Sequence, residues 1–253
     1  MSTFNVLITG TKAGIGQGLL AAFAARPNTT VIAAIRDPPK SEKAQSMVAA
    51  ITEVGVGSKI VPVQYDAGQL SSAQELVDGL KNRGDITHLD IVIANAAIAS
   101  QWGEIKDVQA EEVLTTFRVN TMGPLLLYQT TRDLLLAAKG EPKFFLVSSV
   151  LGSVTKGPDI PFKLVAYGMS KAAGNWFARK ANLEEDRIVV VPVHPGWVQT
   201  AMGDGPAVKL GLQSAPMTID FSVERLMKLF DSTDKEASKG GFLCIDNEGD
   251  SPW

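Results

Sequence analysis

The chain has 253 residues, of which 45% are hydrophobic and 20% charged, with a formal net charge of −3. This balance excludes a disordered chain and suits one large α/β domain over residues 1–253. The Lys and Arg residues are scattered, which argues against nucleic acid as a partner, and Cys244 with His88 and His194 offers neither a disulfide nor a recognisable metal spacing.

Short apolar runs rich in Val and Ile alternate with longer helical stretches along the chain. This alternation predicts a Rossmann-type, doubly wound parallel sheet of seven strands with helices on both faces. The expected strands are Asn5–Ile8, Thr30–Ile35, Lys59–Tyr65, Leu89–Ala94, Lys143–Ser148, Ile188–His194 and Gly241–Ile245. The expected helices are Ile15–Arg26, Ser41–Val54, Ser71–Arg83, Ala110–Ala137, Val165–Leu183 and Ser222–Asp231.

Three features interrupt this pattern. The fourth helical stretch contains Gly123-Pro124, and because proline removes a backbone donor we expect a kink near Asn120–Pro124. The long loops Gly152–Leu164 and Pro195–Ala215 follow strand ends, where open α/β sheets bind their ligands, so we expect them on the substrate side. No apolar run reaches membrane-spanning length and no signal-peptide pattern precedes Val6, so we expect a cytoplasmic protein with no membrane partner.

The first expected strand runs directly into a glycine-rich turn and then a helix, with the spacing T-G-x-x-x-G-x-G over Thr9–Gly16. Glycine lets such a turn adopt positive φ and lets the backbone approach a pyrophosphate at the helix N-terminus. We therefore expect a dinucleotide on Gly10, Thr11, Lys12, Gly14, Ile15 and Gly16. The alternative is a turn that only packs a helix on a strand.

The residues at strand ends bear on which dinucleotide binds. The second strand is followed by Arg36 and then Asp37, and because arginine favours a ribose that carries a phosphate we expect NADP(H), with Lys12 as a second cation. Surface roles for both cations, or Asp37 bonded to the ribose hydroxyls, are the alternatives. Asp66 and Asn95 end the next two strands, either at the cofactor or as caps of local turns.

The candidate reactive groups are Tyr167, Lys171 and Ser149. Tyr167 and Lys171 are four residues apart in a helical stretch and so share one face. An ammonium beside a phenol stabilises the phenolate, so we expect a lowered pKa for Tyr167 and a role as general acid. Ser149 follows an apolar strand, where its hydroxyl can bond the same substrate oxygen, and a nicotinamide hydride would need no protein nucleophile or metal.

Several motifs together resemble the classical short-chain dehydrogenase/reductase family in order and spacing, and they span essentially the whole chain. They are Thr9–Gly16, Asn95-Ala96-Ala97, Asn120, Ser148-Ser149, Tyr167-Gly168-Met169-Ser170-Lys171 and Pro195-Gly196. The segments 194–200 and 241–253 are most similar to the carbonyl-reductase branch of sniffer, the C-factor proteins and the norsolorinic acid ketoreductases.

The resemblance implies a role for each matching residue. Tyr167 is implied as acid and base, and Lys171 as the residue that holds the ribose hydroxyls and tunes Tyr167. Ser149 is implied to orient the substrate, and Asn120 to anchor a water in a proton relay. Further cofactor contacts are implied at Asp66, Asn95, Pro195, Gly196, Val198 and Thr200.

The chain departs from the family pattern at three places. Ala97 replaces the usual glycine after the fourth strand, and the basic residue of the glycine turn is displaced by one position to Lys12. The interval from Ser149 to Tyr167 is longer, which predicts a substrate wall in which Phe162, Trp197 and Met202 either line an apolar pocket or are plain packing residues.

These observations predict an NADPH-dependent reductase that converts a ketone or aldehyde, a small-molecule substrate, to an alcohol. A non-catalytic dinucleotide-binding sensor and a cofactor-binding cyclase or isomerase are the alternatives. The resemblance also implies a homodimer or homotetramer formed through helix pairs.

Overall fold

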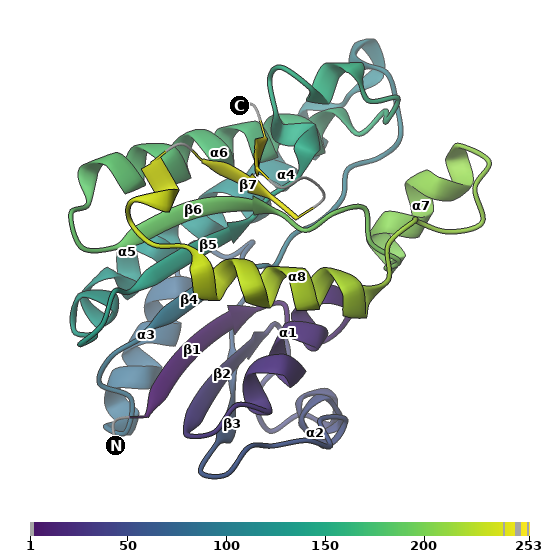
Figure 1. Cartoon of the computed structure of the whole chain (residues 1–253). Helices are drawn as coiled ribbons and strands as arrows, with labels where there is room; N and C mark the ends of the chain where they lie inside the picture. The colour runs from purple at the N-terminus through teal and green to yellow at the C-terminus, as the bar shows by residue number, and fades with distance from the viewer. Residues whose placement is uncertain (1–2, 240, 246–248, 252) are drawn as a thin grey trace.

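The fold is described by a computed structural model over residues 3–239, 241–245, 249–251 and 253 (Figure 1). Its eight-stranded sheet has the order β3-β2-β1-β4-β5-β6-β7-β8, and β1 to β7 pair in parallel. The strands are β1 Phe4–Thr9, β2 Thr29–Ile35, β3 Lys59–Gln64, β4 Ile91–Ala94, β5 Lys143–Val147, β6 Val189–His194, β7 Phe242–Cys244 and β8 Gly249–Ser251.

Helices cover both faces of the sheet. Side chains of α1, α2 and α8 pack with one set of strand residues, and those of α3, α5 and α6 pack with the other set (Figure 1). The helices are α1 Gly14–Ala24, α2 Glu42–Ala49, α3 Ser72–Arg83, α4 Ala110–Phe117, α5 Gly123–Leu136, α6 Val165–Glu184, α7 Ala201–Lys209 and α8 Ile219–Ser232.

The sequence-based prediction of a doubly wound parallel sheet is confirmed. All residues of β2 and β6 are buried, as expected for parallel strands covered on both faces. The expected seventh strand is present as β7. The short antiparallel β8, which pairs Leu243 with Asp250, was not predicted.

The predicted kink near Asn120–Pro124 takes the form of one turn of π-helix between α4 and α5. This turn spans Arg118–Met122, and Pro124 follows it in the first turn of α5, where a missing N–H is tolerated. The irregularity therefore comes from a widened turn that buries Asn120 completely.

Two expected elements were wrong in extent. The helix expected over Ser41–Val54 ends at Ala49, because the chain then turns back toward the end of α1. There the Gly55 N–H donates to the Ala24 carbonyl, and a Cβ on Gly55 would lie 2.3 Å from the Arg26 carbonyl oxygen. The loop Pro195–Ala215 contains α7, which projects from the body of the molecule (Figure 1). Thr200 caps it by accepting a bond from Gly203 N.

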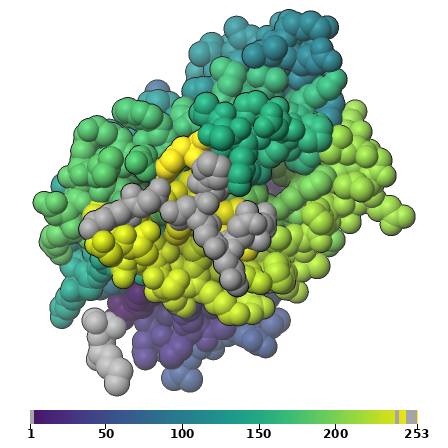
Figure 2. Space-filling model, turned by 45° about the horizontal axis from the view of Figure 1, so that its top comes forward, coloured from purple at the N-terminus to yellow at the C-terminus, as the bar shows by residue number. Residues whose placement is uncertain are grey.

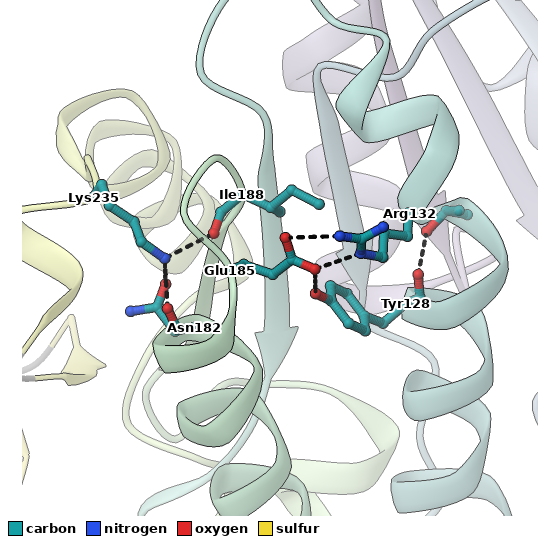
Figure 3. Close-up of polar contacts among 7 residues, drawn as sticks. Tyr128, Arg132, Asn182, Glu185, Ile188 and Lys235 are labelled. Carbon is teal, nitrogen blue, oxygen red and sulfur yellow. Dashed lines mark hydrogen bonds and ion pairs between the residues drawn. The ribbon is translucent and has the colours of Figure 1, made fainter.

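The end of α6 far from the glycine turn is held by polar contacts (Figure 3). Glu185 accepts hydrogen bonds from Arg132 and from the Tyr128 hydroxyl, both on α5. Lys235 donates from the other side to the Asn182 carbonyl, the Asn182 side chain and the Ile188 carbonyl, at 2.6, 2.9 and 3.0 Å. We call this group the α6 end cluster; it ties α6 to α5 and to the segment after α8. Among the described residues, no helix has the length and apolarity needed to cross a membrane.

Candidate active site

The glycine turn after β1 is closely packed and has positive φ angles. Gly10 and Gly14 have φ of 71° and 59°, in the left-handed region that glycine adopts without strain. A Cβ on Gly16 would lie 2.2 Å from the Gly10 carbonyl oxygen and 2.6 Å from Asn95 Nδ2. Only glycine fits here, so the turn has the close packing and open backbone that a dinucleotide pyrophosphate requires.

The end of β4 is bonded to this turn. Asn95 Nδ2 donates to the Thr9 carbonyl at 2.9 Å, and Thr9 Oγ1 accepts from the backbone N–H groups of Asn95 and Ala96. Asp66, at the end of β3, instead accepts from Gly68 N at 2.9 Å within its own turn. Asp66 therefore caps its own turn, one of the two alternatives that the sequence left open, whereas the Asn95 side chain bonds the glycine turn rather than a turn of its own.

The segment after β6 lies against the glycine turn. A Cβ on Gly14 would lie 3.2 Å from Thr200 Cγ2, which places Thr200 directly over that turn. Gly196 has a φ of 82°, and Val198 pairs with Met217 in an isolated bridge. The predicted cofactor residues Pro195, Gly196, Val198 and Thr200 thus lie on one segment facing the turn of residues 10–16.

A charged cluster lies beside the glycine turn. Lys12 and Lys43 both contact the Asp37 carboxylate, at 3.5 and 3.2 Å. Although desolvation raises it, the hydrogen bonds and charges of the two lysines give Asp37 a lowered pKa. Arg36 is exposed next to this cluster. A surface depression is lined here by Lys12, Gln17, Glu42, Lys43, Ser46 and Met47.

The sequence analysis predicted Lys12 and Arg36 at this place but missed Lys43. The sequence feature that could have pointed to Lys43 is its place as the second residue of the helix that follows Arg36 and Asp37.

At the end of β5 the structure brings together the three candidate reactive side chains. The Ser149 hydroxyl lies close enough to the Tyr167 phenol to act on its pKa as a hydrogen-bond partner. Lys171 lies one turn after Tyr167 on α6, with its Nζ 5.5 Å from the centre of the Tyr167 ring. Only 2% of Lys171 is exposed, and its Nζ donates a hydrogen bond to the Val147 carbonyl at 2.7 Å.

The predicted lowering of the Tyr167 pKa is wrong for the protein without cofactor. Burial raises the pKa of Tyr167 to about 12, and the hydrogen bond with Ser149 opposes that rise. Burial also lowers the pKa of Lys171 to about 7. Desolvation outweighs the attraction between the groups because Lys171 bonds a carbonyl oxygen and not the phenol.

Asn120 is completely buried beneath these residues. Its side chain bonds Ile98 through both the backbone N–H and the carbonyl, each at 2.9 Å, and its Nδ2 also donates to Ser170 Oγ at 3.1 Å. Ser170 Oγ in turn donates to the Tyr167 carbonyl at 2.7 Å. Asn120 therefore joins the π-helical turn, the loop after β4 and the first turns of α6.

Three aromatic residues, Trp102, Phe162 and Trp197, come together from the loops after β4, β5 and β6, and we call them the aromatic wall. The Phe162 ring lies 4.8 Å from Trp197 and 6.2 Å from Trp102, centre to centre. Trp197 Nε1 donates to the Gly203 carbonyl at 2.8 Å, which fixes the wall to α7.

The loops that carry the wall are themselves joined. Gly103 pairs with Leu164 in a parallel bridge, and Lys163 forms an ion pair with Glu104 at 2.8 Å. In Figure 2 these segments, blue and green, lie side by side at the top of the molecule.

The sequence analysis predicted Phe162 and Trp197 at this wall but missed Trp102, whose contact is between distant loops. Met202, the third predicted pocket residue, is 36% exposed on α7. Within the described part of the chain, no group of three or more His, Cys, Asp and Glu side chains is placed to hold a metal ion.

The sequence matches the short chain dehydrogenase family over residues 5–207. A curated relative, the norsolorinic acid ketoreductase of Aspergillus parasiticus, is 36% identical over 248 residues, covering 98% of this chain and 90% of that protein. Another, the short-chain dehydrogenase srdF of Neurospora crassa, is 33% identical and covers 98% of this chain and 97% of its own.

Solved structures of carbonyl reductases have the same fold as this chain. The NADPH-bound carbonyl reductase from chicken fatty liver superposes with a TM-score of 0.83 at 27% identity, covering 100% of both chains. The carbonyl reductase Sniffer of D. melanogaster has the same fold, with a TM-score of 0.82 at 24% identity, covering 99% of this chain and 100% of its own.

Proposed function

The chain belongs to the short-chain dehydrogenase family and is an oxidoreductase, and on that premise we propose that it reduces a ketone to an alcohol with NADPH. The observation that carries the proposal is that Ser149, Tyr167 and Lys171 lie together after β5, at the strand ends that also carry the glycine turn. A non-catalytic sensor would have no use for this group.

The residues divide the reaction between them. NADPH, when bound, supplies the hydride to the carbonyl carbon. The Tyr167 hydroxyl donates its proton to the carbonyl oxygen, and Ser149 donates a hydrogen bond to the same oxygen and so stabilises the charge that develops on it. Lys171 lies beside the phenol, and in its protonated form it favours loss of that proton. The products are NADP+ and the alcohol, and one proton from solvent restores Tyr167.

The preference for NADPH is supported by the cations beside the glycine turn. Arg36 is exposed, and Lys12 and Lys43 lie on either side of Asp37, whose charge they already neutralise. A ribose 2′-phosphate there would meet three cations and one paired carboxylate. The chicken structure is of an NADPH-bound enzyme, in agreement with this proposal.

The aromatic wall supports a flat or aromatic ketone as the substrate. Trp102, Phe162 and Trp197 offer ring faces and edges on the loops after β4, β5 and β6, at the strand ends where open α/β sheets bind their ligands. The curated relative at 36% identity is named as a ketoreductase, which favours a ketone over an aldehyde.

The test is oxidation of NADPH by the purified protein with aliphatic, aromatic and quinone-type carbonyl compounds, repeated with NADH. We expect turnover with aromatic ketones and a higher kcat/KM with NADPH. Tight NADPH binding with no oxidation on any compound would contradict reduction and favour a sensor. A rearranged product without net NADPH consumption would instead favour a cyclase or isomerase.

A further inference from the structure

Asn175 is a buried side chain of α6 that the proposed reaction does not use. It lies eight residues after Tyr167 and four after Lys171, so the three share one face of the helix. Only 2% of Asn175 is exposed. A buried amide costs free energy unless its donor and acceptor atoms are both bonded, so its partners indicate what it holds.

Both ends of the amide are bonded to the segment after β5. Asn175 Oδ1 accepts a hydrogen bond of 2.5 Å from Ser148 Oγ, and Asn175 Nδ2 donates one of 3.2 Å to the Gly152 carbonyl. A carbonyl oxygen can only accept, so Nδ2 must face Gly152 and the Ser148 hydroxyl must donate.

The two partners flank Ser149. Ser148 precedes it directly, and Gly152 closes the single turn of 3₁₀ helix, Val150–Gly152, that follows it. That turn lies against α6, because a Cβ on Gly152 would lie 2.7 Å from the backbone of Lys171. The Ser149 side chain accepts a hydrogen bond from Leu151 N in this turn and lies beside Tyr167 on α6.

We propose that Asn175 is a positioning residue that holds the Ser149 hydroxyl against Tyr167 by fixing the chain on both sides of it. The proposal rests on the proposed function, because it assigns Asn175 to the same reacting pair. Lys171 bonds the Val147 carbonyl and adds a third attachment of this segment to α6. Of these two α6 side chains, Asn175 is the one that bonds the chain on both sides of Ser149.

The same helix provides a matched control for a purely structural role. Asn182, seven residues further along α6, is also buried and bonded at both ends of its amide. Its Nδ2 donates to the Ser238 carbonyl at 3.2 Å, and its Oδ1 accepts from Val190 N at 2.9 Å. Asn182→Leu removes more polar contacts than Asn175→Leu, including the bond from Lys235, but at the end of the helix far from Tyr167, so it is a stringent control for loss of buried polar contacts alone.

The first experiment does not depend on enzyme activity, because it measures the NMR signal of Tyr167. The chain has three tyrosines, so protein labelled with 13C at tyrosine Cζ gives few signals, and Tyr167→Phe assigns that of Tyr167. We expect Asn175→Leu to move the Tyr167 signal in the same direction as Ser149→Ala, and Asn182→Leu to leave it in place. Ser148→Ala, which keeps the Gly152 bond, should move it less, and it serves as the second variant if Asn175→Leu does not fold.

The second experiment measures turnover with NADPH and a ketone. We expect Asn175→Leu to lower kcat about 100-fold, with the NADPH dissociation constant within about twofold of the wild-type value. Because both changes act through one hydroxyl, Ser149→Ala/Asn175→Leu should be no slower than Ser149→Ala alone. Absence of turnover in the wild-type protein would count against the proposed function only, since the Tyr167 signal still decides the role of Asn175. A Tyr167 signal unmoved by Asn175→Leu and Ser148→Ala but moved by Ser149→Ala would overturn the proposal.

Discussion

The two ends of α6 each hold a lysine that is partly or wholly removed from water, but in different settings. At the active-site end, Lys171 is almost fully buried and donates a hydrogen bond to the Val147 carbonyl. At the far end, Lys235 donates to three oxygen atoms of Asn182 and Ile188, with Glu185 nearby (Figure 3). One end leaves its charge poorly compensated, and the other surrounds it with acceptors.

The pKa values reflect this difference. Burial alone lowers the pKa of Lys171 to about 7. Burial also lowers the pKa of Lys235, but the charges of Glu185, Asp186 and Glu141 oppose that change. A poorly compensated buried amine is unfavourable for folding and is common where a proton must be handled, so the comparison separates residues kept for chemistry from residues kept for stability.

The largest expected effect is that of Tyr167→Phe at the active-site end. The change keeps the ring and removes the hydroxyl that bonds Ser149. We expect kcat for ketone reduction to fall about 10²- to 10⁴-fold, with NADPH binding nearly unchanged. The measurements are the rate of NADPH oxidation and a fluorescence titration with NADPH. Undiminished turnover would remove Tyr167 from the mechanism.

The next prediction concerns the cost of Lys171 to the fold. The unfolded chain keeps this amine protonated up to about pH 10.5, whereas the folded chain releases the proton near pH 7, so between these values the unfolded state binds more protons. The free energy of unfolding should therefore rise with pH across that window. Lys171→Met should remove this rise and, at pH 7, increase the free energy of unfolding by on the order of 2 kcal/mol while abolishing reduction.

The measurement for Lys171→Met is urea unfolding of the ligand-free protein at several pH values. The matched variant is Lys235→Met at the other end of α6, which we expect to destabilise the fold. Lower stability of both variants at pH 7 would show that Lys171 also supports the fold, and the contrast between the two ends would fail.

The sequence predicted the parts of the fold that depend on local pattern. The parallel strands are continuous apolar runs such as Val189–His194, because both faces are covered. Helix α7 was missed because Gly203, Gly205 and Pro206 all disfavour a helix, and only the cap at Thr200 and the contacts of its loop offset this. Strand β8 was missed because it is three residues long and exists through its pairing with β7.

The site was predictable where one element carries two groups, and less so where distant loops meet. Tyr167 and Lys171 are one helical turn apart, so their proximity follows from spacing. Trp102 reaches Phe162 through a loop that no local pattern positions. The sign of the Tyr167 pKa shift was missed because burial of the pair, which a sequence does not give, outweighs their attraction.

A smaller effect is expected from Glu185→Gln in the α6 end cluster. Burial raises the pKa of Glu185. The hydrogen bonds from Arg132 and Tyr128 and the charges of Arg132 and Lys235 lower it by more, so the pKa lies below its usual value. A lowered carboxyl pKa stabilises the fold above the unfolded-state value, and this contribution is lost as the pH falls through the folded-state pKa. We expect a loss of about 1–2 kcal/mol near neutral pH with unchanged ketone reduction.

The pH dependence of stability separates the contribution of the Glu185 charge from the contribution of its packing. Thermal or urea unfolding of the wild-type protein and Glu185→Gln should converge in acid, where the wild-type carboxyl is also neutral. A constant difference down to low pH would assign the loss to packing. A reduced kcat would show that the two ends of α6 are coupled, contrary to the comparison.

The smallest effect is expected at the neighbouring residue, with Glu184→Gln. Glu184 pairs with Lys180 at 2.8 Å, but their side chains are 61% and 52% exposed, so water and salt screen the attraction. We expect the free energy of unfolding to change by no more than about 0.5 kcal/mol. Because Glu184 and Glu185 are adjacent and differ chiefly in burial and partners, the two variants measured by the same unfolding assay isolate what the α6 end cluster contributes. Equal losses for the two variants would mean that a charge near the helix end, and not the contacts with Arg132 and Tyr128, stabilises this end of α6.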